Sequence, residues 1–413
     1  MKVLQINSHY DQGGAARIVA TLHRQLQKKG IDSYVAYGRG KKTKEEHVYK
    51  FGSEAGVYAS ALCSRMSGWN GYFNAIATGK LIGFIKQIQP DIIHMHVLHG
   101  YYLHVPMLFH YINKNNIPCV WTFHDCHAFV GNCGYFFDCR SWESGCGNCP
   151  YLRNYPVSRW FDQTREMWQQ KKELFTKNTN KLLVTPSKWL KEETAKSFFK
   201  DFECVTIANG IDTEQTFYPH NKAECRKKYG YTDHEKLVLG VAAGYRDERK
   251  GAEYILQLAK DLEKEAKVIL IGWNHEKNHM LKGLNNVVAL KNTKDKELLA
   301  EYYSMADVFV IPSLAENYAT TSLEAMACGT PVVGFDVGGI GEQVAEGKGK
   351  VVPVGNREAF AEAVREVMNQ SEGILSGEQL AATVGLENSA ERMAQQYEEL
   401  YLRLYESRTR VKE

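Results

Sequence analysis

The chain has 413 residues, of which 44% are apolar and 24% charged, an ordinary globular composition with room for two or three domains. Its 51 Lys and Arg residues nearly balance 48 Asp and Glu residues, which argues against a dedicated nucleic-acid binder with a strongly basic domain. No stretch approaches the ~20 apolar residues that a membrane span needs, and the N-terminus lacks a secretory apolar run. We therefore expect a cytoplasmic protein.

Short apolar runs alternate with helical patterns through the first half of the chain. A strand is expected at 2–7, and a helix is expected to follow Gly13-Gly14 and to run to about Lys29. The other expected strands of this half are short, β-branched or aromatic runs bounded by turn residues. They cover residues 33–37, 92–96, 119–123, 182–185 and 205–207.

The same rhythm returns in the second half. Strands are expected at 238–241, 267–271, 287–290, 308–312 and 331–335. Alternating strands and helices are typical of parallel sheets that helices cover on both faces. The sequence thus predicts an α/β fold with two Rossmann-like domains, 1–208 and 236–388, facing across a cleft. We expect a linker at 209–235 and a long amphipathic helix in 389–413.

Two glutamates follow the strand at 308–312. Glu316 and Glu324 are separated by seven residues, and a helix is expected to begin near Asn317. The free N–H groups and positive dipole end of that helix would favour an anion, and the two carboxylates would suit hydroxyl groups of a sugar and a ribose. The alternative is that Glu316 only caps the helix and Glu324 is a solvated helix residue.

A second candidate segment, Gly244–Gly251, follows the strand at 238–241. It holds Arg246, Arg249 and Lys250 between glycines at an expected strand-to-helix turn. Basic side chains and backbone N–H groups in such a turn suit a diphosphate. The alternative is a solvated loop.

Two features of the first half point to the same chemistry. Gly13 and Gly14 open the first helix, where missing side chains let a ligand approach and the helix N-terminus favours anions. The alternative there is a tight strand-to-helix turn. His124 follows the strand at 119–123, a place where an imidazole can bond a hydroxyl or a phosphate oxygen. His94 and His96, at the end of the preceding strand, are expected to line a cleft or to be structural.

Five of the ten cysteines lie between Cys126 and Cys149. The last two, Cys146 and Cys149, have a spacing common in structural zinc sites, and four thiolates satisfy tetrahedral zinc. The expected ligands are Cys133, Cys139, Cys146 and Cys149. Free or redox-active thiols and disulfides are the alternatives. The aromatic residues of loop 128–155 would stack on sugar rings of an acceptor or form the small core of the loop.

These motifs resemble the retaining glycosyltransferases of family four, which have the GT-B architecture. The resemblance rests on Glu316 and Glu324 in their spacing and on the run Ala-Met-Ala-Cys-Gly-Thr-Pro-Val-Val at 325–333. Gly338-Gly339 and Glu342 match a further turn of the family. In the GT-B architecture, the final helix crosses back to the first domain.

The resemblance implies roles for individual residues. His124 and Glu316 would contact the donor sugar, Lys250 the diphosphate and Glu324 the ribose, with His124, Lys250 and Glu316 as the catalytic set. The implied donor-binding residues are Gly13, Gly14, Arg246, Arg249, Asn317, Tyr318, Ala319 and Glu324. In one departure, Tyr245 stands where the family has an arginine. We therefore expect Arg246 or Arg249 to supply the second cation.

The implied reaction transfers a hexosyl group from a nucleoside-diphosphate sugar to a hydroxyl of a glycan or lipid-linked acceptor, in capsule, exopolysaccharide or lipopolysaccharide synthesis. No Asp-x-Asp arrangement demands a catalytic metal, so no catalytic cofactor is expected. Lipid-linked acceptors favour association with the inner face of the membrane. A basic N-terminal face around Arg24, Lys28, Lys29 and 41–44 is compatible with that expectation.

Two other functions share the architecture or the ligands. One is a sugar-nucleotide 2-epimerase, which we would not expect to carry the run at 325–333. The other is a non-catalytic carbohydrate-binding assembly partner. The complete set of His124, Lys250, Glu316 and Glu324 argues against the latter. The donor, the acceptor and the oligomeric state do not follow from the sequence.

Overall fold

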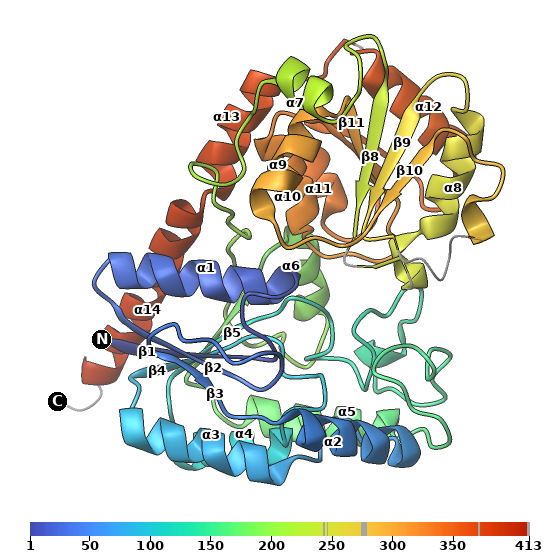
Figure 1. Ribbon diagram of the computed structural model, residues 1–413. Coiled ribbons are helices and arrows are strands. Elements are labelled where there is room, and N and C mark those ends of the chain that lie inside the picture. Colours follow the sequence, from blue (N-terminus) through green and yellow to red (C-terminus); the bar gives the residue numbers. More distant parts are fainter. Residues whose placement is uncertain (243, 246, 274–278, 371, 411–413) are drawn as a thin grey trace. The chain divides into compact units, whose positions relative to one another are not determined.

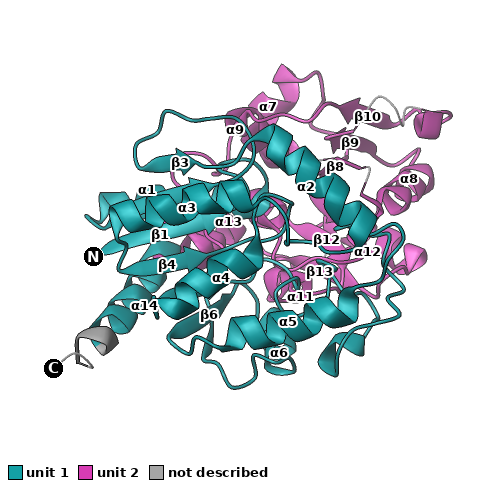
Figure 2. Cartoon of the chain, turned by 90° about the horizontal axis from the view of Figure 1, so that it is seen from below, with its two compact units in different colours: residues 1–208, 393–413 teal, residues 209–392 magenta. Residues whose placement is uncertain are grey.

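The computed structural model describes residues 1–242, 244–245, 247–273, 279–370 and 372–410. The chain divides into two compact units (Figure 2). Unit 1 comprises Met1–Ala208 and Met393–Glu413, and unit 2 comprises Asn209–Arg392. Each unit has its own parallel sheet with helices, which confirms the expected α/β class.

Unit 1 contains, within its described residues, a seven-stranded sheet in which all neighbouring strands are parallel. Its strands are β1 (Lys2–Asn7), β2 (Asp32–Tyr37), β3 (Val48–Lys50), β4 (Ile92–Met95), β5 (Cys119–Thr122), β6 (Lys181–Thr185) and β7 (Cys204–Thr206). They lie in the order β3-β2-β1-β4-β5-β6-β7. Figure 1 labels β1 to β5 of this sheet. Because the strands are parallel, the segments after β1, β4 and β5 leave the same edge of the sheet.

Helices cover both faces of this sheet. They are α1 (Gly14–Lys28), α2 (Glu54–Ser67), α3 (Ala75–Ile88), α4 (Val105–Lys114), α5 (Thr164–Thr176), α6 (Lys188–Ala195) and α14 (Ala390–Arg410), with a 3-10 turn η1 (Ser141–Glu143). Alternate residues of β1 point to opposite faces. Val3 packs with α1 and α14, whereas Leu4 and Ile6 pack with α2, α3 and α4. Burial on both faces explains the nearly continuous apolar runs of the strands.

The C-terminal helix α14 belongs to unit 1 from Met393 onward. Its buried side chains recur at helical spacing, so that one stripe faces the sheet. These side chains are Met393, Tyr397, Leu400, Tyr401 and Leu404. The expected return of the final helix to the first domain is thereby confirmed.

Unit 2 contains, in its described part, a six-stranded parallel sheet in the order β10-β9-β8-β11-β12-β13. Its strands are β8 (Leu237–Val241), β9 (Lys267–Ile271), β10 (Val287–Leu290), β11 (Val308–Ile311), β12 (Val332–Phe335) and β13 (Gly349–Val352). Its helices are α7 (Lys222–Lys228), α8 (Ala252–Asp261), α9 (Lys296–Met305), α10 (Thr320–Ala327), α11 (Ile340–Val344), α12 (Arg357–Met368) and α13 (Gly377–Asn388), with a 3-10 turn η2 (Glu248–Lys250).

Neighbouring residues of β8 pack into the core on opposite faces of the unit 2 sheet. Val238 packs against α8 and α12, and Leu239 packs against α9 and α10 on the other face. Since β8 and β11 are neighbours in the sheet, the loops that follow them emerge side by side. Those two loops carry the candidate residues of the second half.

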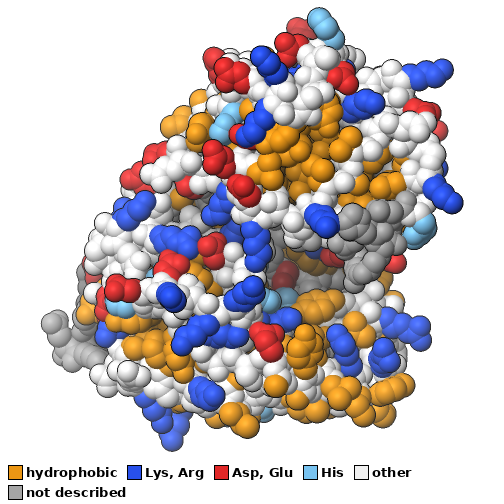
Figure 3. All heavy atoms as spheres, in the orientation of Figure 1, with side chains coloured by type: hydrophobic (Ala, Val, Ile, Leu, Met, Phe, Trp, Pro, Cys, Tyr) orange, Lys and Arg blue, Asp and Glu red, His pale blue; other side chains and the backbone are white. Residues whose placement is uncertain are grey.

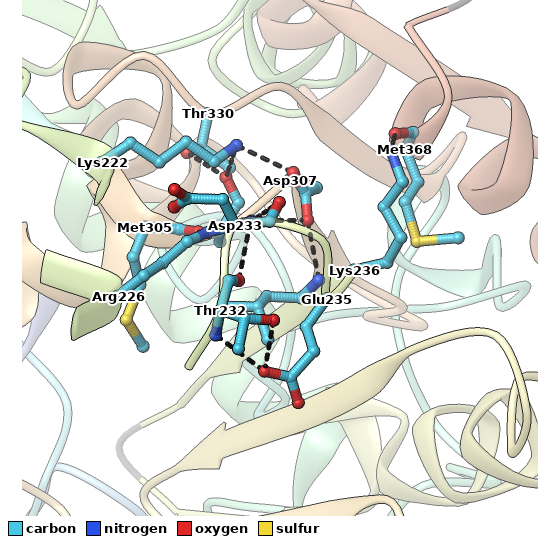
Figure 4. A network of polar contacts seen from close by, with 12 residues as sticks. Lys222, Arg226, Thr232, Asp233, Glu235, Lys236, Met305, Asp307, Thr330 and Met368 are labelled. Atoms are coloured by element: carbon cyan, nitrogen blue, oxygen red, sulfur yellow. Dashed lines mark hydrogen bonds and ion pairs between the residues drawn. The ribbon is translucent and has the colours of Figure 1, made fainter. Parts of the chain in front are cut away.

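Residues 209–235, expected to form a linker, pack on unit 2. The buried Arg226 donates to the carbonyl of Met305 at 3.0 Å and pairs with Asp307 at 2.8 Å (Figure 4). Lys222 pairs with the other oxygen of Asp307, also at 2.8 Å. Two cations on one carboxylate hold α7 against the segment before β11, so this stretch is part of the folded unit.

The edge strands β3 and β13 were absent from the sequence prediction. β3 has only three residues, and β13 opens with Gly349 and Lys350, so that Val351 and Val352 alone suggest a strand there. No described helix combines the length and apolar character needed to cross a membrane.

Candidate functional site

A cluster of opposite charges lies where the segments after β8 and β11 meet. Lys250 Nζ donates to Glu316 Oε2 at 2.6 Å. Arg249 Nη1 lies 3.3 Å from the same oxygen and donates to the carbonyl of Ala315 at 2.6 Å. Arg249 also pairs with Asp247 at 3.3 Å. The structure therefore brings Lys250, Arg249 and Glu316 together, and their predicted roles in donor binding stay a prediction.

Glu316 is ionised and only 8% exposed. Burial alone would raise the pKa of Glu316. The charges of Lys250 and Arg249, and hydrogen bonds from Lys250 and the Asn317 N–H, instead lower this pKa to about 2. A fixed carboxylate of this kind can accept hydrogen bonds from hydroxyl groups, while the cations beside it can bind an anion.

Two glycines let neighbouring loops close on the Glu316 segment. Gly251 has φ 65°, and a Cβ there would stand 1.9 Å from the carbonyl oxygen of Pro312. Gly338 has φ 58°, and a Cβ there would stand 1.7 Å from the carbonyl oxygen of Glu316. Any other residue would push these backbones apart, so both glycines are needed for the close approach.

The helix after Glu316 begins later than expected. Helix α10 starts at Thr320, because Ala319 is extended (φ −73°, ψ 122°). The N–H of Ala319 donates to Gln343 Oε1, and its carbonyl accepts from Gln343 Nε2, both at 3.0 Å. Asn317 and Tyr318 lie in the loop before the helix. The expectation of a helix start near Asn317 was therefore wrong.

Glu324 lies on α10 and is 1% exposed. The hydroxyl of Tyr303, on α9, donates to Glu324 Oε2 at 3.0 Å. A carboxylate buried to this degree requires donors, and it is not a solvated helix residue. The alternative reading of Glu324 as a surface residue was wrong.

Tyr245, which stands in place of the family's arginine, belongs to the core. It is 2% exposed, and its ring centroid lies 5.4 Å from that of Trp273. Of the two arginines expected to supply the second cation, Arg246 lies outside the described residues. Arg249 is beside Glu316, so it is the described arginine that fits this role.

In unit 1, the candidate residues lie at one edge of the sheet. Gly13 has φ 91° and precedes α1, which begins at the exposed Gly14. A Cβ at either glycine would meet nothing within 4 Å, so packing does not require glycine at these two positions. The positive φ does favour glycine at position 13. His124 follows β5 and is partly buried, and burial lowers its pKa to about 4.

Two other histidines near this edge have different partners: His94 bonds to two hydroxyl groups, and His99 pairs with a carboxylate. His94 is buried, with Nδ1 2.6 Å from the hydroxyl of Tyr401 and Nε2 2.8 Å from Thr122 Oγ1, so it ties α14 to the sheet. His99 Nε2 lies 2.6 Å from Asp125 Oδ2. Burial would raise the pKa of Asp125, but the charge and hydrogen bond of His99 hold this pKa well below its usual range.

The expected zinc site has no support in the structure. Across the described part of the chain, no group of three or more His, Cys, Asp or Glu side chains could hold a metal ion. Cys133, Cys139, Cys146 and Cys149 are free thiols. Burial raises the pKa of Cys133, and it raises that of Cys146 to about 11. Protonated thiols are poor nucleophiles, which also argues against a redox role for these two partly buried cysteines.

Three aromatic residues of the same loop form its core rather than a sugar platform. Phe129, Phe136 and Trp142 are each at most 4% exposed. The ring of Trp142 lies 5.0 Å from Phe129 and 5.1 Å from Phe136, between centroids. Of the two roles considered for loop aromatics, the structure supports the core role for these three.

Sequence reasoning missed two polar residues that shape the candidate site. Gln343 clamps Ala319, and nothing in its sequence context marks it. Gln5 lies fully buried in β1, with Oε1 3.2 Å from His96 Nε2. A lone amide within an apolar strand was a usable signal, because buried polar side chains need partners.

Two family models match the chain, and both describe glycosyltransferases. Residues 12–215 match the family model "Glycosyltransferase Family 4", and residues 221–380 match "Glycosyl transferases group 1". The chain is 25% identical to WcaC of Escherichia coli, assigned to colanic acid biosynthesis as a glycosyl transferase, over 85% of this chain and 87% of that protein.

Two solved structures share the fold. Sucrose-phosphate synthase of Thermosynechococcus elongatus superimposes with TM-score 0.73 and 20% identity, covering 98% of this chain and 99% of that one. HepE of Anabaena, solved with UDP-glucose, gives TM-score 0.67 and 16% identity over 97% and 99% of the two chains. With both halves matched by glycosyltransferase family models, the chain belongs to the family-four glycosyltransferases of GT-B architecture.

Proposed function

We propose that the chain transfers a hexosyl group from a nucleoside-diphosphate sugar to a hydroxyl group, with retention at the anomeric carbon. The observation that carries this proposal is the buried, ionised Glu316, with Lys250 at 2.6 Å and Arg249 at 3.3 Å from one of its oxygens. A sugar diphosphate presents hydroxyl groups next to phosphate oxygens. The carboxylate suits the former and the two cations suit the latter.

Each of these side chains has a role in the proposed reaction. Negative charge develops on the leaving diphosphate as its bond to the sugar breaks, and Lys250 and Arg249 stabilise that charge. Glu316 orients the donor sugar through its hydroxyl groups. Glu324, which already accepts from Tyr303, holds the ribose. The acceptor attacks from the face of the departing phosphate, which helps to take its proton, and no covalent nucleophile is assigned.

The relatives support a substrate class. WcaC is assigned to colanic acid biosynthesis, which supports a glycan or lipid-linked saccharide acceptor in cell-surface polysaccharide synthesis. HepE was solved with UDP-glucose, which makes uridine donors the first to test.

The test is a product assay. The purified chain is incubated with labelled UDP-, GDP- or ADP-hexoses and a lipid-linked saccharide extract, and the products are separated by mass and by anomeric configuration. We expect a new glycosidic bond of retained configuration with one donor class. An isomerised nucleotide sugar would identify an epimerase instead. Donor binding without turnover would identify a carbohydrate-binding partner.

The second part of the proposal is association with a membrane. We place the membrane-binding surface on a face other than the basic face that the sequence suggested. Arg24 of that basic face is neutralised by Asp11 at 3.0 Å and Glu45 at 2.9 Å, and Lys29 pairs with Glu398 at 3.1 Å. Charges that are already paired attract an anionic surface weakly.

An apolar patch on unit 1 fits a bilayer better. It consists of Tyr58, Leu62 and Met66, one stripe of α2, with Trp160 and Phe161, and each is at least 48% exposed. The N–H of Arg159 donates to the carbonyl of Arg65 at 3.0 Å, so the two aromatic residues lie at the end of α2. Figure 3 shows hydrophobic side chains gathered along the edge that α2 occupies in Figure 1, with Lys and Arg beside them.

Exposed aromatic residues flanked by arginines are the chemistry of an interfacial anchor on anionic lipid. We expect the chain to sediment with phosphatidylglycerol vesicles and not with phosphatidylcholine vesicles. A Trp160→Ser/Phe161→Ser variant should lose most of this binding. The control is Leu386→Ser in unit 2, which removes a hydrophobic residue that is more exposed (75%) than Trp160 or Phe161 and lies outside the patch. Self-association that the double variant abolishes, without vesicle binding, would contradict the lipid assignment.

A further inference from the structure

The loop that carries Glu316 has no regular secondary structure. Residues 316–319, called the donor loop below, lie between β11 and α10. A buried backbone outside helices and sheets must find hydrogen-bond partners among other groups. The carbonyl of Tyr318 finds one in Asn209, whose Nδ2 donates to it at 3.0 Å. Asn209 is the first residue of unit 2, so this partner lies far from the donor loop in the sequence.

Asn388, the last residue of α13, supports the other end of Tyr318. Its Nδ2 donates to the hydroxyl of Tyr318 and to the carbonyl of Asn209, each at 3.2 Å. The orientation of both amides follows from these contacts, because a peptide carbonyl has no hydrogen and can only accept. Tyr318 is therefore held at its peptide by Asn209 and at its hydroxyl by Asn388, and the two asparagines are hydrogen-bonded to each other.

Both asparagines are buried and anchored. Asn209 is 6% exposed, and Asn388 is 5% exposed. The Ile211 N–H donates to the carbonyl of Asn388 at 2.9 Å, and the carbonyl of Ile211 accepts from the Ala390 N–H at 2.8 Å. Because water has little access to such amides, it does not readily replace a lost hydrogen bond. All of these residues belong to unit 2.

Support for Tyr318 bears on Glu316, which precedes it in the donor loop. The carboxylate of Glu316 lies 2.6 Å from Lys250, so a displaced loop would separate the charges of the candidate site. A loop that few contacts hold opens locally at a small cost in free energy. A ligand that binds only the closed loop then binds more weakly, in proportion to the loss of the closed state. Contacts that keep the donor loop closed thus increase affinity without touching the ligand.

We propose that Asn209 and Asn388 are positioning residues of the donor site, which hold Tyr318 and thereby keep Glu316 in the arrangement that binds a nucleotide sugar. The identity of the ligand rests on the proposed function, whereas the support of the donor loop rests on contacts within unit 2 alone. Neither asparagine touches the donor in this arrangement. Both act on the strength of donor binding, through the position of the donor loop.

Hydrogen exchange of the full-length chain without ligand tests the support of the loop. The Ala319 N–H donates to Gln343, and the Gly339 N–H donates to the carbonyl of Asn317, so both amides are protected while the donor loop is closed. In Asn209→Ala, we expect the peptides that contain these two amides to exchange several times faster than in wild type, because the loop opens more often.

The matched control is Asn286→Ala. Asn286 is also a buried asparagine of unit 2, 3% exposed, and its Nδ2 donates to the carbonyls of Ala259 and Ala266 at 2.8 Å and 3.0 Å. This variant should lose a comparable amount of stability, but the exchange of the two amides should stay as in wild type. Equal acceleration in both variants, or no acceleration in Asn209→Ala, overturns the positioning role of Asn209.

Asn388 is tested together with the hydroxyl that it holds. Asn388→Ala and Tyr318→Phe both remove the contact between Asn388 and the Tyr318 hydroxyl. Tyr318→Phe should weaken donor binding a few-fold, and Asn388→Ala should cost less affinity in the Tyr318→Phe protein than in wild type. Because Tyr318→Phe removes a single hydroxyl, it serves even if the alanine variants fold poorly. Fully additive losses, or no loss in Tyr318→Phe, overturn the role of Asn388.

Donor binding is measured with UDP-, GDP- and ADP-glucose on wild type, Asn209→Ala and Asn286→Ala. For the nucleotide sugar that binds wild type, Asn209→Ala should raise Kd and KM about tenfold and leave kcat little changed, as the loss of one buried hydrogen bond away from the reacting atoms predicts. Asn286→Ala should bind as wild type does. A lower kcat at unchanged KM contradicts the positioning role. If none of the three binds wild type, the proposed function fails, and the exchange result still decides whether Asn209 supports the loop.

Discussion

One carboxylate oxygen organises the candidate site at the scale of single residues. Glu316 Oε2 faces both Lys250 and Arg249, and the carboxylate is buried. Removing one partner of such a cluster leaves another charge without its counterion, so substitutions here affect stability as well as chemistry. Activity must therefore be compared between variants that remain folded.

The first prediction concerns Lys250. Lys250→Met should lower kcat/KM roughly 10²–10³-fold, because a cation that stabilises the developing diphosphate charge is lost. The matched control is Lys348→Met, which breaks the Lys348–Glu387 pair of 2.7 Å near β13, away from this cluster. The control should retain activity. Near-wild-type turnover in a folded Lys250→Met protein would remove Lys250 from the mechanism.

The second prediction concerns pH and Glu316. The pKa of Glu316 in the folded chain is about 2, below the ordinary value of 4.5, so its charge stabilises the folded state above pH 4.5. That contribution is lost as the pH falls from 4.5 toward 2, where the folded state must also take up the proton. Urea unfolding should show wild type more stable than Glu316→Gln at neutral pH, with the gap closing over this range. A gap that widens on acidification would contradict the ion pairs.

At the scale of elements, the sequence predicted most of the strands. It did not predict where α10 begins or that Tyr245 lies in the core. Buried central strands such as β1 and β9 have the predicted bounds, because apolar runs between turn residues mark them. The start of α10 was misplaced, since the clamp of Ala319 by Gln343 is a tertiary contact between segments 24 residues apart. The core position of Tyr245 likewise depends on its contact with Trp273.

The third prediction concerns the loop after β12. Gly338→Ala should displace the Glu316 backbone, because the new Cβ would stand 1.7 Å from its carbonyl oxygen. We expect a lower Tm and a loss of donor binding. Gly230→Ala is the control, since Gly230 has a similar positive φ of 79° with nothing within 4 Å of a Cβ. Equal effects of the two variants would attribute the loss to backbone strain alone.

At the scale of the whole molecule, the two units carry different parts of the proposed function. Unit 2 holds Lys250, Arg249, Glu316 and Glu324 on segments that one sheet brings together, and these side chains form the donor site of our account. Unit 1 holds His124, which lies against the buried His96, and the apolar patch proposed to meet the bilayer. The fold class followed from sequence periodicity, whereas the contacts of Tyr318 with Asn209 and Asn388 required the structure.

The most direct test of this account is the thermal unfolding of wild type and Lys250→Met with UDP-, GDP- and ADP-hexoses. Ligands that bind only the folded state raise Tm, by an amount equivalent to roughly 2.7 kcal/mol at a hundredfold excess over Kd. We predict that one nucleotide class stabilises wild type and that Lys250→Met loses most of this stabilisation. No stabilisation by any of the three donors, or equal stabilisation of both proteins, would contradict a donor site built on Lys250 and Glu316.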